Sequence, residues 1–155
     1  MSDERNTITG TSGNEDLIGT SGNDLIKPKD GVDFVLQCLD KMWGGELFVP
    51  KIPSFRIMDI AKAIAPNCKN KIVGIRPGEK LHEEMITETD ALNCVEFDKY
   101  FVILPSTILW DVDKFRKESN SSIGKICEYG FSYNSGTNKH FLNVTDLQEL
   151  IENCI

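Results

Sequence analysis

The sequence lacks the long apolar runs of membrane proteins and the cysteine and histidine patterns of disulfide-rich and zinc proteins. No stretch approaches the roughly 18 consecutive apolar residues of a membrane span, and the start, MSDERNTITG, has no apolar core of a signal peptide. Histidine occurs twice, and the 5 cysteines are widely spread without a C-x-x-C pair. We therefore expect a cytoplasmic protein with reduced thiols, no disulfide framework, no zinc site and no membrane partner.

Positive charge is also scarce. The formal net charge is -7 at pH 7, which disfavours a general attraction to nucleic acid, so an anionic ligand needs a local basic anchor. The 155 residues, 40% of them apolar, are enough for one ordinary domain that buries roughly 70% of the surface of its unfolded chain.

Glycine is concentrated near the start, where GTSGNEDLI from Gly10 is followed by GTSGNDLI from Gly19. This spacing of nine resembles the nonapeptide repeat of the RTX calcium-binding β-roll, and the resemblance implies Asp16 and Asp24 as calcium ligands. A stacked solenoid usually needs at least three repeats, and only two occur here. The alternative is a flexible leader with two turns, so residues 1–28 are assigned to an RTX-like leader and 29–155 to a second portion.

The character of the sequence changes after Lys29. Apolar residues at helical spacing predict a helix over 31–43, ended by Gly44 and Gly45; the residues are Val32, Val35, Leu36, Leu39, Met42 and Trp43. ELFVP at 46–50 predicts a buried strand, after which Ser54 is expected to cap a helix whose Ile57, Ile60, Ala61 and Ile64 face inward.

Further along the chain, KIVGIR at 71–76 and YFVIL at 100–104 predict strands, and PGEKLHEEM after Arg76 predicts a short helix. Residues 105–128 read as a loop with a turn of helix around Lys114, and Asn143 is expected to cap a final helix. Alternating strands and helices indicate an α/β fold, but the strands are too few for a complete doubly wound sheet.

The stretch VGIRPGEKLHEEM, residues 73–85, holds the strongest candidate site. A guanidinium at a strand end clamps phosphate through its planar donor fork, and Pro77-Gly78 would turn the chain so that Glu79 faces the same space. There its carboxylate accepts hydrogen bonds from vicinal hydroxyls, so the pair suits a nucleoside diphosphate. The alternative for Arg76 is an ion pair with a local glutamate.

Three segments extend this interpretation: residues 31–66, KIVGIRPGEKLHEEMITE at 71–88, and FSYNSGTN at 131–138. They resemble the C-terminal part of the inverting UDP-N-acetylglucosamine 4,6-dehydratases, which are extended short-chain dehydrogenase/reductases that make precursors of pseudaminic acid and surface polysaccharides. The resemblance implies that Arg76 binds the diphosphate and Glu79 the uridine ribose. It also implies that His82 borders the nucleotide. The alternative is that His82 is an exposed polar residue on the surface of a helix.

The same resemblance implies chemistry that this chain lacks. Those enzymes hold NADP on a Rossmann half with a glycine-rich loop and a Tyr-x-x-x-Lys pair, whereas Tyr100, Tyr129 and Tyr133 are followed four residues later by leucine, tyrosine and threonine. We expect a partial, substrate-binding portion of an extended Rossmann-type fold that lacks the dinucleotide-binding half and does not turn over alone.

The expected function is UDP-sugar binding by a dehydratase remnant joined near 27–30 to an unrelated leader. The expected partners are a UDP-sugar and either a Rossmann-domain partner or a second copy of the chain. In this view Val32, Val35, Leu39 and Phe48 are left exposed and favour self-association. The alternative is a calcium-binding leader on a non-enzymatic interaction or complementation module. The polar turn at 134–138 either caps a sheet or touches a sugar, and sequence leaves both open.

Overall fold

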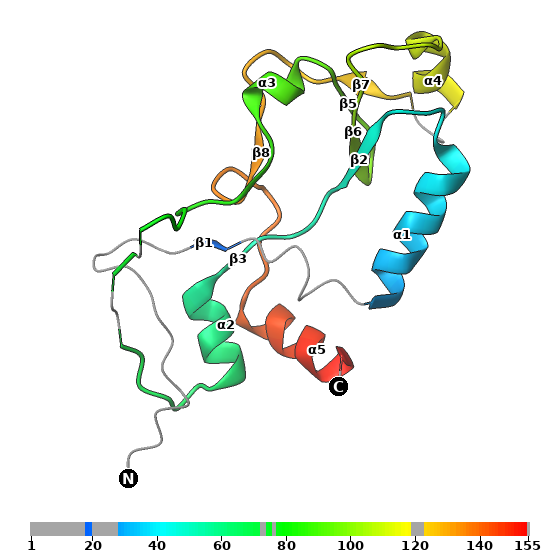
Figure 1. The fold of residues 1–155 in the computed structure, drawn as a ribbon. Coiled ribbons are helices and arrows are strands. Elements are labelled where there is room, and N and C mark those ends of the chain that lie inside the picture. Colours follow the sequence, from blue (N-terminus) through cyan, green and yellow to red (C-terminus); the bar gives the residue numbers. More distant parts are fainter. Residues whose placement is uncertain (1–17, 20–27, 72–73, 76, 119–122, 155) are drawn as a thin grey trace. The chain divides into compact units, whose positions relative to one another are not determined.

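The chain forms two compact units that each combine segments distant in sequence. The computed structural model describes residues 18–19, 28–71, 74–75, 77–118 and 123–154 (Figure 1). Unit 1 comprises Met1–Leu25, Pro53–Glu83 and Asn134–Ile155, and unit 2 comprises Ile26–Ile52 and Glu84–Tyr133. The expected mixture of helices and strands is confirmed, and no helix within the described ranges is long and apolar enough to cross a membrane.

Unit 2 is built on a four-stranded sheet in the order β2-β6-β5-β7, with every neighbouring pair antiparallel. The strands are β2 (Leu47–Pro50), β6 (Tyr100–Ile103), β5 (Cys94–Glu96) and β7 (Lys125–Ile126). The strands predicted at ELFVP and YFVIL are therefore confirmed. Strands β5 and β7 escaped sequence reasoning because two or three residues are too few to show a period.

Two clusters of buried side chains cover this sheet. One gathers around Ile86 and Phe101, and the other around Val102 and Phe115. Phe115 is fully buried on α4 (Val112–Glu118), where it stacks on Trp110 at 4.8 Å between ring centroids and on Trp43 at 5.6 Å. The turn of helix expected near Lys114 is thus confirmed, and its burial is driven by aromatic contacts.

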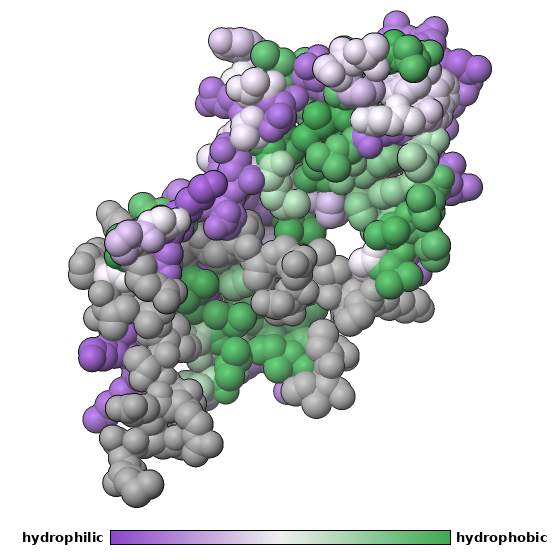
Figure 2. All heavy atoms as spheres, in the orientation of Figure 1, coloured by the Kyte–Doolittle hydropathy of each residue, from purple (hydrophilic) through white to green (hydrophobic). Residues whose placement is uncertain are grey.

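Helix α1 (Pro28–Lys41), which is part of unit 2, contacts Tyr100 of β6 with the face opposite to its apolar stripe. Phe34 meets the Tyr100 ring edge-on at 6.0 Å, and the Lys41 ammonium lies 5.5 Å above the same ring. The stripe itself is exposed, at 59% for Val32, 58% for Leu36 and 61% for Leu39. Figure 2 shows hydrophobic residues gathered along this helix.

The expected exposure of this stripe is confirmed, but the same expectation for Phe48 is wrong. Phe48 is half-buried because its ring stacks on Tyr100 at 5.5 Å and joins the second core cluster. Phe48 therefore finds its packing partners within unit 2.

The helix expected after Pro77 is absent, because the chain there turns and then pairs as a strand. Pro77 and Gly78 form a turn, and β4 (Glu84–Ile86) pairs with β8 (Tyr133–Asn134). Thr87 then starts α3 (Glu88–Ala91) with a capping box in which its hydroxyl accepts from the Asp90 amide. The good helix formers at 79–85 lose to pairing with a distant strand.

The strand expected at 71–76 is also wrong where the structure describes it. Lys71, Gly74 and Ile75 are outside any strand, and Gly74 has φ +85°, which is incompatible with extended backbone.

Unit 1 is organised by two helices in contact, α2 (Ile57–Ile64) and α5 (Val144–Cys154) (Figure 1). Ala61 and Leu147, at 2% and 0% exposure, are buried residues of these helices. Ile64 is 64% exposed, so its expected inward orientation is wrong. The short β1 (Ile18–Gly19) pairs antiparallel with β3 (Phe55–Arg56). Most of residues 1–28 lie outside the described ranges, and their separate status stays a prediction.

The two predicted helix caps in unit 1 have opposite outcomes. Asn143 caps α5, since its Oδ1 accepts from the amides of Thr145 at 2.8 Å and Asp146 at 3.1 Å. Ser54 does not cap α2: the N-cap is Arg56, without a side-chain bond, and Ser54 is fully buried in a bridge to Phe141.

Candidate functional site

A polar loop at 134–138, NSGTN, forms the centre of the candidate site in unit 1. The Asn134 side-chain oxygen accepts hydrogen bonds from the amides of Gly136 at 2.9 Å and Thr137 at 3.0 Å. This Asx turn fixes the loop backbone locally, which is the usual use of asparagine in turns. Sequence reasoning singled out the loop but left its role open.

The loop is joined to the end of segment 77–83 by a reciprocal pair of hydrogen bonds. The Ser135 amide donates to the Glu83 carbonyl at 2.9 Å, and the Glu83 amide donates to the Ser135 hydroxyl at 3.0 Å. Ser135 is fully buried, so this hydroxyl serves the protein's own backbone. Two segments separated by about fifty residues are therefore fixed in register at one point.

His82 lies directly against the same loop. A Cβ added to Gly136 would stand 3.0 to 3.1 Å from three atoms of the His82 ring, closer than side chains normally approach. The absent side chain at Gly136 thus leaves room for the imidazole, which is itself exposed. His82 is therefore held beside the loop at 134–138, with its ring exposed.

A third segment enters the site through Ser54. The Asn138 side-chain amide donates to the Ser54 hydroxyl at 2.9 Å, while the Ser54 amide donates to the His140 carbonyl and the Leu142 amide donates to the Ser54 carbonyl, both at 2.8 Å. Ser54 and Ser135 are the two buried polar residues among those described, and the hydroxyl of each accepts a hydrogen bond. Segments from 54, 82–83 and 134–142 therefore meet in unit 1.

The predicted ligand-binding residues are only partly placed by the structure. Glu79 and His82 belong to unit 1 and are exposed on the segment that follows the Pro77-Gly78 turn. Gly78 has φ +86°, a backbone conformation that glycine adopts without strain, so this turn depends on it. Arg76 lies outside the described residues, and its pairing with Glu79 stays a prediction.

The predicted calcium ligands Asp16 and Asp24 also lie outside the described residues. Among the residues that the structure does describe, no group of three or more histidine, cysteine, aspartate or glutamate side chains is arranged to hold a metal ion. The calcium proposal therefore rests on the sequence repeat alone.

Tyr133 directly precedes the loop at 134–138 and belongs to unit 2, where its hydroxyl is hydrogen-bonded. Its hydroxyl donates to the Ile52 carbonyl and accepts from the Ile52 amide, both at 2.8 Å. Burial raises the pKa of Tyr133, and the hydrogen bond to Ile52 partly offsets this. Sequence reasoning missed this residue because the link joins positions 81 residues apart.

Lys51 is bound within unit 2 and does not act as a solvated loop cation. Its ammonium pairs with the Glu96 carboxylate at 2.6 Å and lies 4.7 Å above the Phe101 ring. Both contacts tie the chain after β2 to the sheet, so Lys51 has a structural role here.

The fold resembles that of a larger solved protein. The X-ray structure of Pen from Bacillus thuringiensis matches with a TM-score of 0.66 and 22% identity, over 97% of this chain and 42% of that chain. The likeness places this chain in the class of mixed α/β folds and matches it to part of a larger fold of that class.

Sequence comparison then gives the family. A family model described as polysaccharide biosynthesis protein matches residues 25–105, so the chain belongs to the polysaccharide biosynthesis protein family. The inverting UDP-N-acetylglucosamine 4,6-dehydratase of Campylobacter jejuni serotype O:2 is 45% identical over 127 residues, covering 81% of this chain and 38% of the relative. The resemblance stated from the motifs is thereby confirmed.

A more distant relative has a different reaction in its name. UDP-glucose 4-epimerase of Rickettsia bellii is 29% identical over 133 residues, covering 83% of this chain and 38% of the relative. The chain thus spans about 38% of the length of each of these two relatives.

The residues present do not fit a dinucleotide cofactor. The sequence has no Tyr-x-x-x-Lys, and from Pro28 onward no strand that the structure describes leads through a glycine-rich turn into a helix. Such a turn is what places backbone amides against a pyrophosphate. No catalytic step through NADP is therefore assigned to this chain.

Proposed function

We propose that this chain binds the UDP portion of a nucleotide sugar and supplies the substrate-binding part of a 4,6-dehydratase of surface polysaccharide biosynthesis. One observation carries the proposal. Parts of the three segments that resemble the dehydratases meet in unit 1 through hydrogen bonds of Ser54, Ser135 and Asn138, alongside 45% identity to the Campylobacter enzyme.

The geometry supports binding because it fixes the backbone of the segment that carries Glu79 and His82. Reciprocal bonds between Glu83 and Ser135 anchor the downstream end of their segment, and Gly78 sets the turn upstream. A segment held at both ends presents its side chains with little further loss of conformational entropy on binding. In this proposal Arg76 clamps the diphosphate, Glu79 accepts from the ribose hydroxyls and His82 borders the nucleotide.

Isothermal titration calorimetry with UDP tests the proposal directly. Arg76→Ala is expected to weaken UDP binding by about 1.5 to 3 kcal/mol, the range for a hydrogen bond to a charged group, which is roughly 10- to 150-fold in Kd. Glu79→Gln should weaken it less, because the amide oxygen still accepts a hydrogen bond.

The matched control is Lys80→Ala, which removes one positive charge from an exposed neighbouring position. It should leave UDP affinity within about twofold, since an exposed charge at a distance is screened by salt. Equal losses in both variants would reduce the effect to general electrostatics. No heat of UDP binding at millimolar concentration to the folded chain would contradict the proposal.

The chain alone is proposed to be inactive and to act together with a Rossmann-type part. The exposed stripe of α1 supports this proposal, because an amphipathic helix normally buries its apolar face and α1 uses its other face within unit 2. The part of the Campylobacter dehydratase that this chain does not span is the appropriate partner for a test.

Mixing the chain with that part should restore NADP-dependent conversion of UDP-N-acetylglucosamine that neither component shows alone. Leu36→Gln with Leu39→Gln should weaken the assembly at least tenfold, because both side chains are more than half exposed and ready for burial. Leu109→Gln, at an exposed leucine away from α1, is the control. Full activity of the chain by itself would overturn this part of the proposal.

A further inference from the structure

Two of the cysteines are cross-strand neighbours in unit 2. Strands β5 and β7 are antiparallel, with Val95 opposite Ile126 and Glu96 opposite Lys125. The next position along this register places Cys94 opposite Cys127, and the Cys127 amide donates to the Cys94 carbonyl at 2.9 Å. The backbone thus brings together two thiols that are 33 positions apart (127 minus 94).

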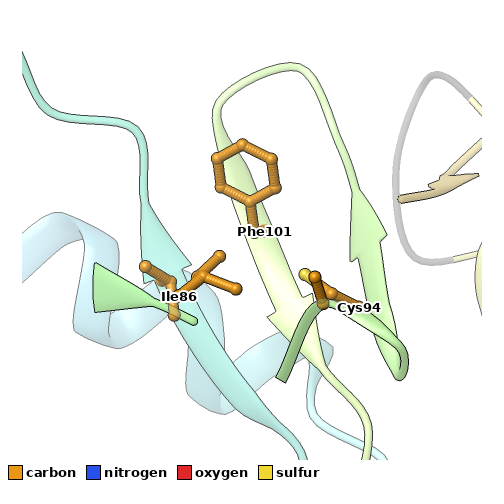
Figure 3. Packing of buried hydrophobic residues seen from close by; sticks show 5 residues of the cluster. Ile86, Cys94 and Phe101 are labelled. Carbon is orange, nitrogen blue, oxygen red and sulfur yellow. The ribbon is translucent and has the colours of Figure 1, made fainter. Parts of the chain in front are cut away.

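The two side chains are in direct contact. The Cys94 thiol, 1% exposed, is a donor to the Cys127 sulfur, and Cys127 packs half-buried against the core cluster that contains Cys94. Figure 3 shows Cys94 beside Ile86 and Phe101 in that cluster. Cys94 is therefore buried, and its neighbour Cys127 is partly exposed.

The surroundings make the two thiols unequal. The hydrogen bond from Cys94 lowers the pKa of Cys127, with the ammonium groups of Lys51 and Lys125 acting in the same direction against burial and Glu96. The pKa of Cys94 is raised, first by the same hydrogen bond and then by burial. A partly exposed, more acidic thiol next to a buried, less acidic one is the arrangement of an attacking and a resolving cysteine.

We propose that Cys94 and Cys127 form a reversible redox site that closes to a disulfide by exchange with a low-molecular-weight disulfide such as glutathione disulfide. The Cys127 thiolate attacks one sulfur of glutathione disulfide, breaking its S–S bond and releasing one glutathione thiolate. Cys94 loses its proton and attacks the Cys127 sulfur of the mixed disulfide, releasing the second glutathione. The two protein thiols are oxidised, and one glutathione disulfide is reduced to two glutathione molecules.

The new bond would tie β7 to β5 and close the chain between them, including β6 and α4. A cross-link restricts the unfolded chain, so the oxidised form should unfold at a higher urea concentration than the reduced form. The site is independent of the nucleotide-sugar proposal, because every residue in it belongs to unit 2.

Peptide mapping of the full chain tests the proposal. The native protein is incubated with excess glutathione disulfide, remaining thiols are alkylated, and peptides are identified by mass spectrometry. We expect a peptide pair cross-linked through Cys94 and Cys127 that is lost on addition of dithiothreitol. Cys38 and Cys68 should be recovered alkylated or carrying glutathione.

Two variants separate the roles of the thiols. Cys94→Ala should stop cross-linking and leave glutathione attached to Cys127, because the resolving thiol is gone. Cys38→Ala, a matched loss of a half-buried thiol, should retain the cross-link. A native chain that keeps glutathione on Cys127 while Cys94 stays a free thiol would overturn the proposal, as would a cross-link that forms only in urea.

Discussion

At the scale of single residues, three hydroxyl groups fix the loops of this protein. Tyr133 binds both backbone groups of Ile52, Ser135 binds the Glu83 amide, and Ser54 accepts from Asn138. Each joins positions more than fifty residues apart in the sequence. Local sequence propensity does not reveal such long-range hydrogen bonds. The sequence alone therefore does not show when a polar side chain in a loop has a structural role.

Tyr133→Phe should destabilise unit 2 by about 1 to 3 kcal/mol. The change removes two hydrogen bonds at 2.8 Å and keeps the ring, which stacks on Phe101 at 5.1 Å. Urea unfolding followed by tryptophan fluorescence measures the loss. Tyr129→Phe, whose tyrosine is 94% exposed, is the control and should be neutral; equal effects of both changes would contradict the prediction.

The same hydroxyl predicts a loss of stability at high pH. Burial raises the pKa of Tyr133 above its usual value of about 10, so the folded state keeps the phenol proton to higher pH than the unfolded chain. Stability is then complete below about pH 10 and falls as the pH rises through the folded-state pKa. Unfolding free energies measured across this pH range should fall less steeply in Tyr133→Phe. Burial also raises the pKa of Tyr100, so that residue accounts for part of the slope that remains.

At the scale of secondary-structure elements, α1 is the clearest departure from an isolated folded domain. Its stripe of large apolar side chains is about half exposed or more, while Phe34, Cys38 and Lys41 on the other face are partly buried against the rest of unit 2. Exposed apolar surface of this kind marks an interaction site. The helix is held by aromatic and cation–π contacts to Tyr100, which leave its most hydrophobic face unused.

Leu36→Gln with Leu39→Gln should remove self-association of the isolated chain without destabilising it. Both side chains are mostly exposed, so the free energy of unfolding should change by no more than about 0.5 kcal/mol. Light scattering and binding of an apolar dye measure association and exposed surface. A native chain that is monomeric and binds no dye would contradict this prediction.

Phe34→Ala tests the other face of the same helix, which contacts Tyr100. Its ring is half-buried against Tyr100, so its removal should lower stability by about 1 to 3 kcal/mol, less than for a fully buried phenylalanine, while leaving the exposed stripe in place. Self-association should therefore persist in this variant.

At the scale of the whole molecule, the buried core that the structure describes is concentrated in unit 2. Both clusters of buried hydrophobic residues found among the described residues lie there, whereas the described part of unit 1 is organised by contact between α2 and α5. Apolar burial supplies most of the stability of small domains, so unit 1 is expected to unfold first.

Leu147→Ala tests this order. Leu147 is fully buried on α5, and its truncation should cost unit 1 about 2 to 5 kcal/mol. Both tryptophans belong to unit 2, so the fluorescence transition should stay in place while the part of the helical circular dichroism signal that comes from α2 and α5 is lost at lower urea concentration. A shift of both signals together would show that the units unfold as one.

Much of the secondary structure was predictable where a pattern is long or a motif is local. The helix at 31–43, the strands ELFVP and YFVIL, and the cap at Asn143 follow from periodicity and capping chemistry. The errors at Ser54, at the helix expected after Pro77 and in the strand expected at 71–76 have two causes. In the first two, backbone groups of those segments pair with distant residues, and in the third a glycine adopts positive φ.

The sequence by itself determined the family, the helical pattern of α1 and the absence of a Tyr-x-x-x-Lys pair, because these depend only on residue identity and spacing. Tertiary structure decided which face of α1 is buried, which serines hold the loop at 134–138, and that Cys94 meets Cys127. An amphipathic pattern specifies that a face can be buried, but burial requires a complementary surface. Within this chain that surface is presented by the Tyr100 ring to the other side of the helix.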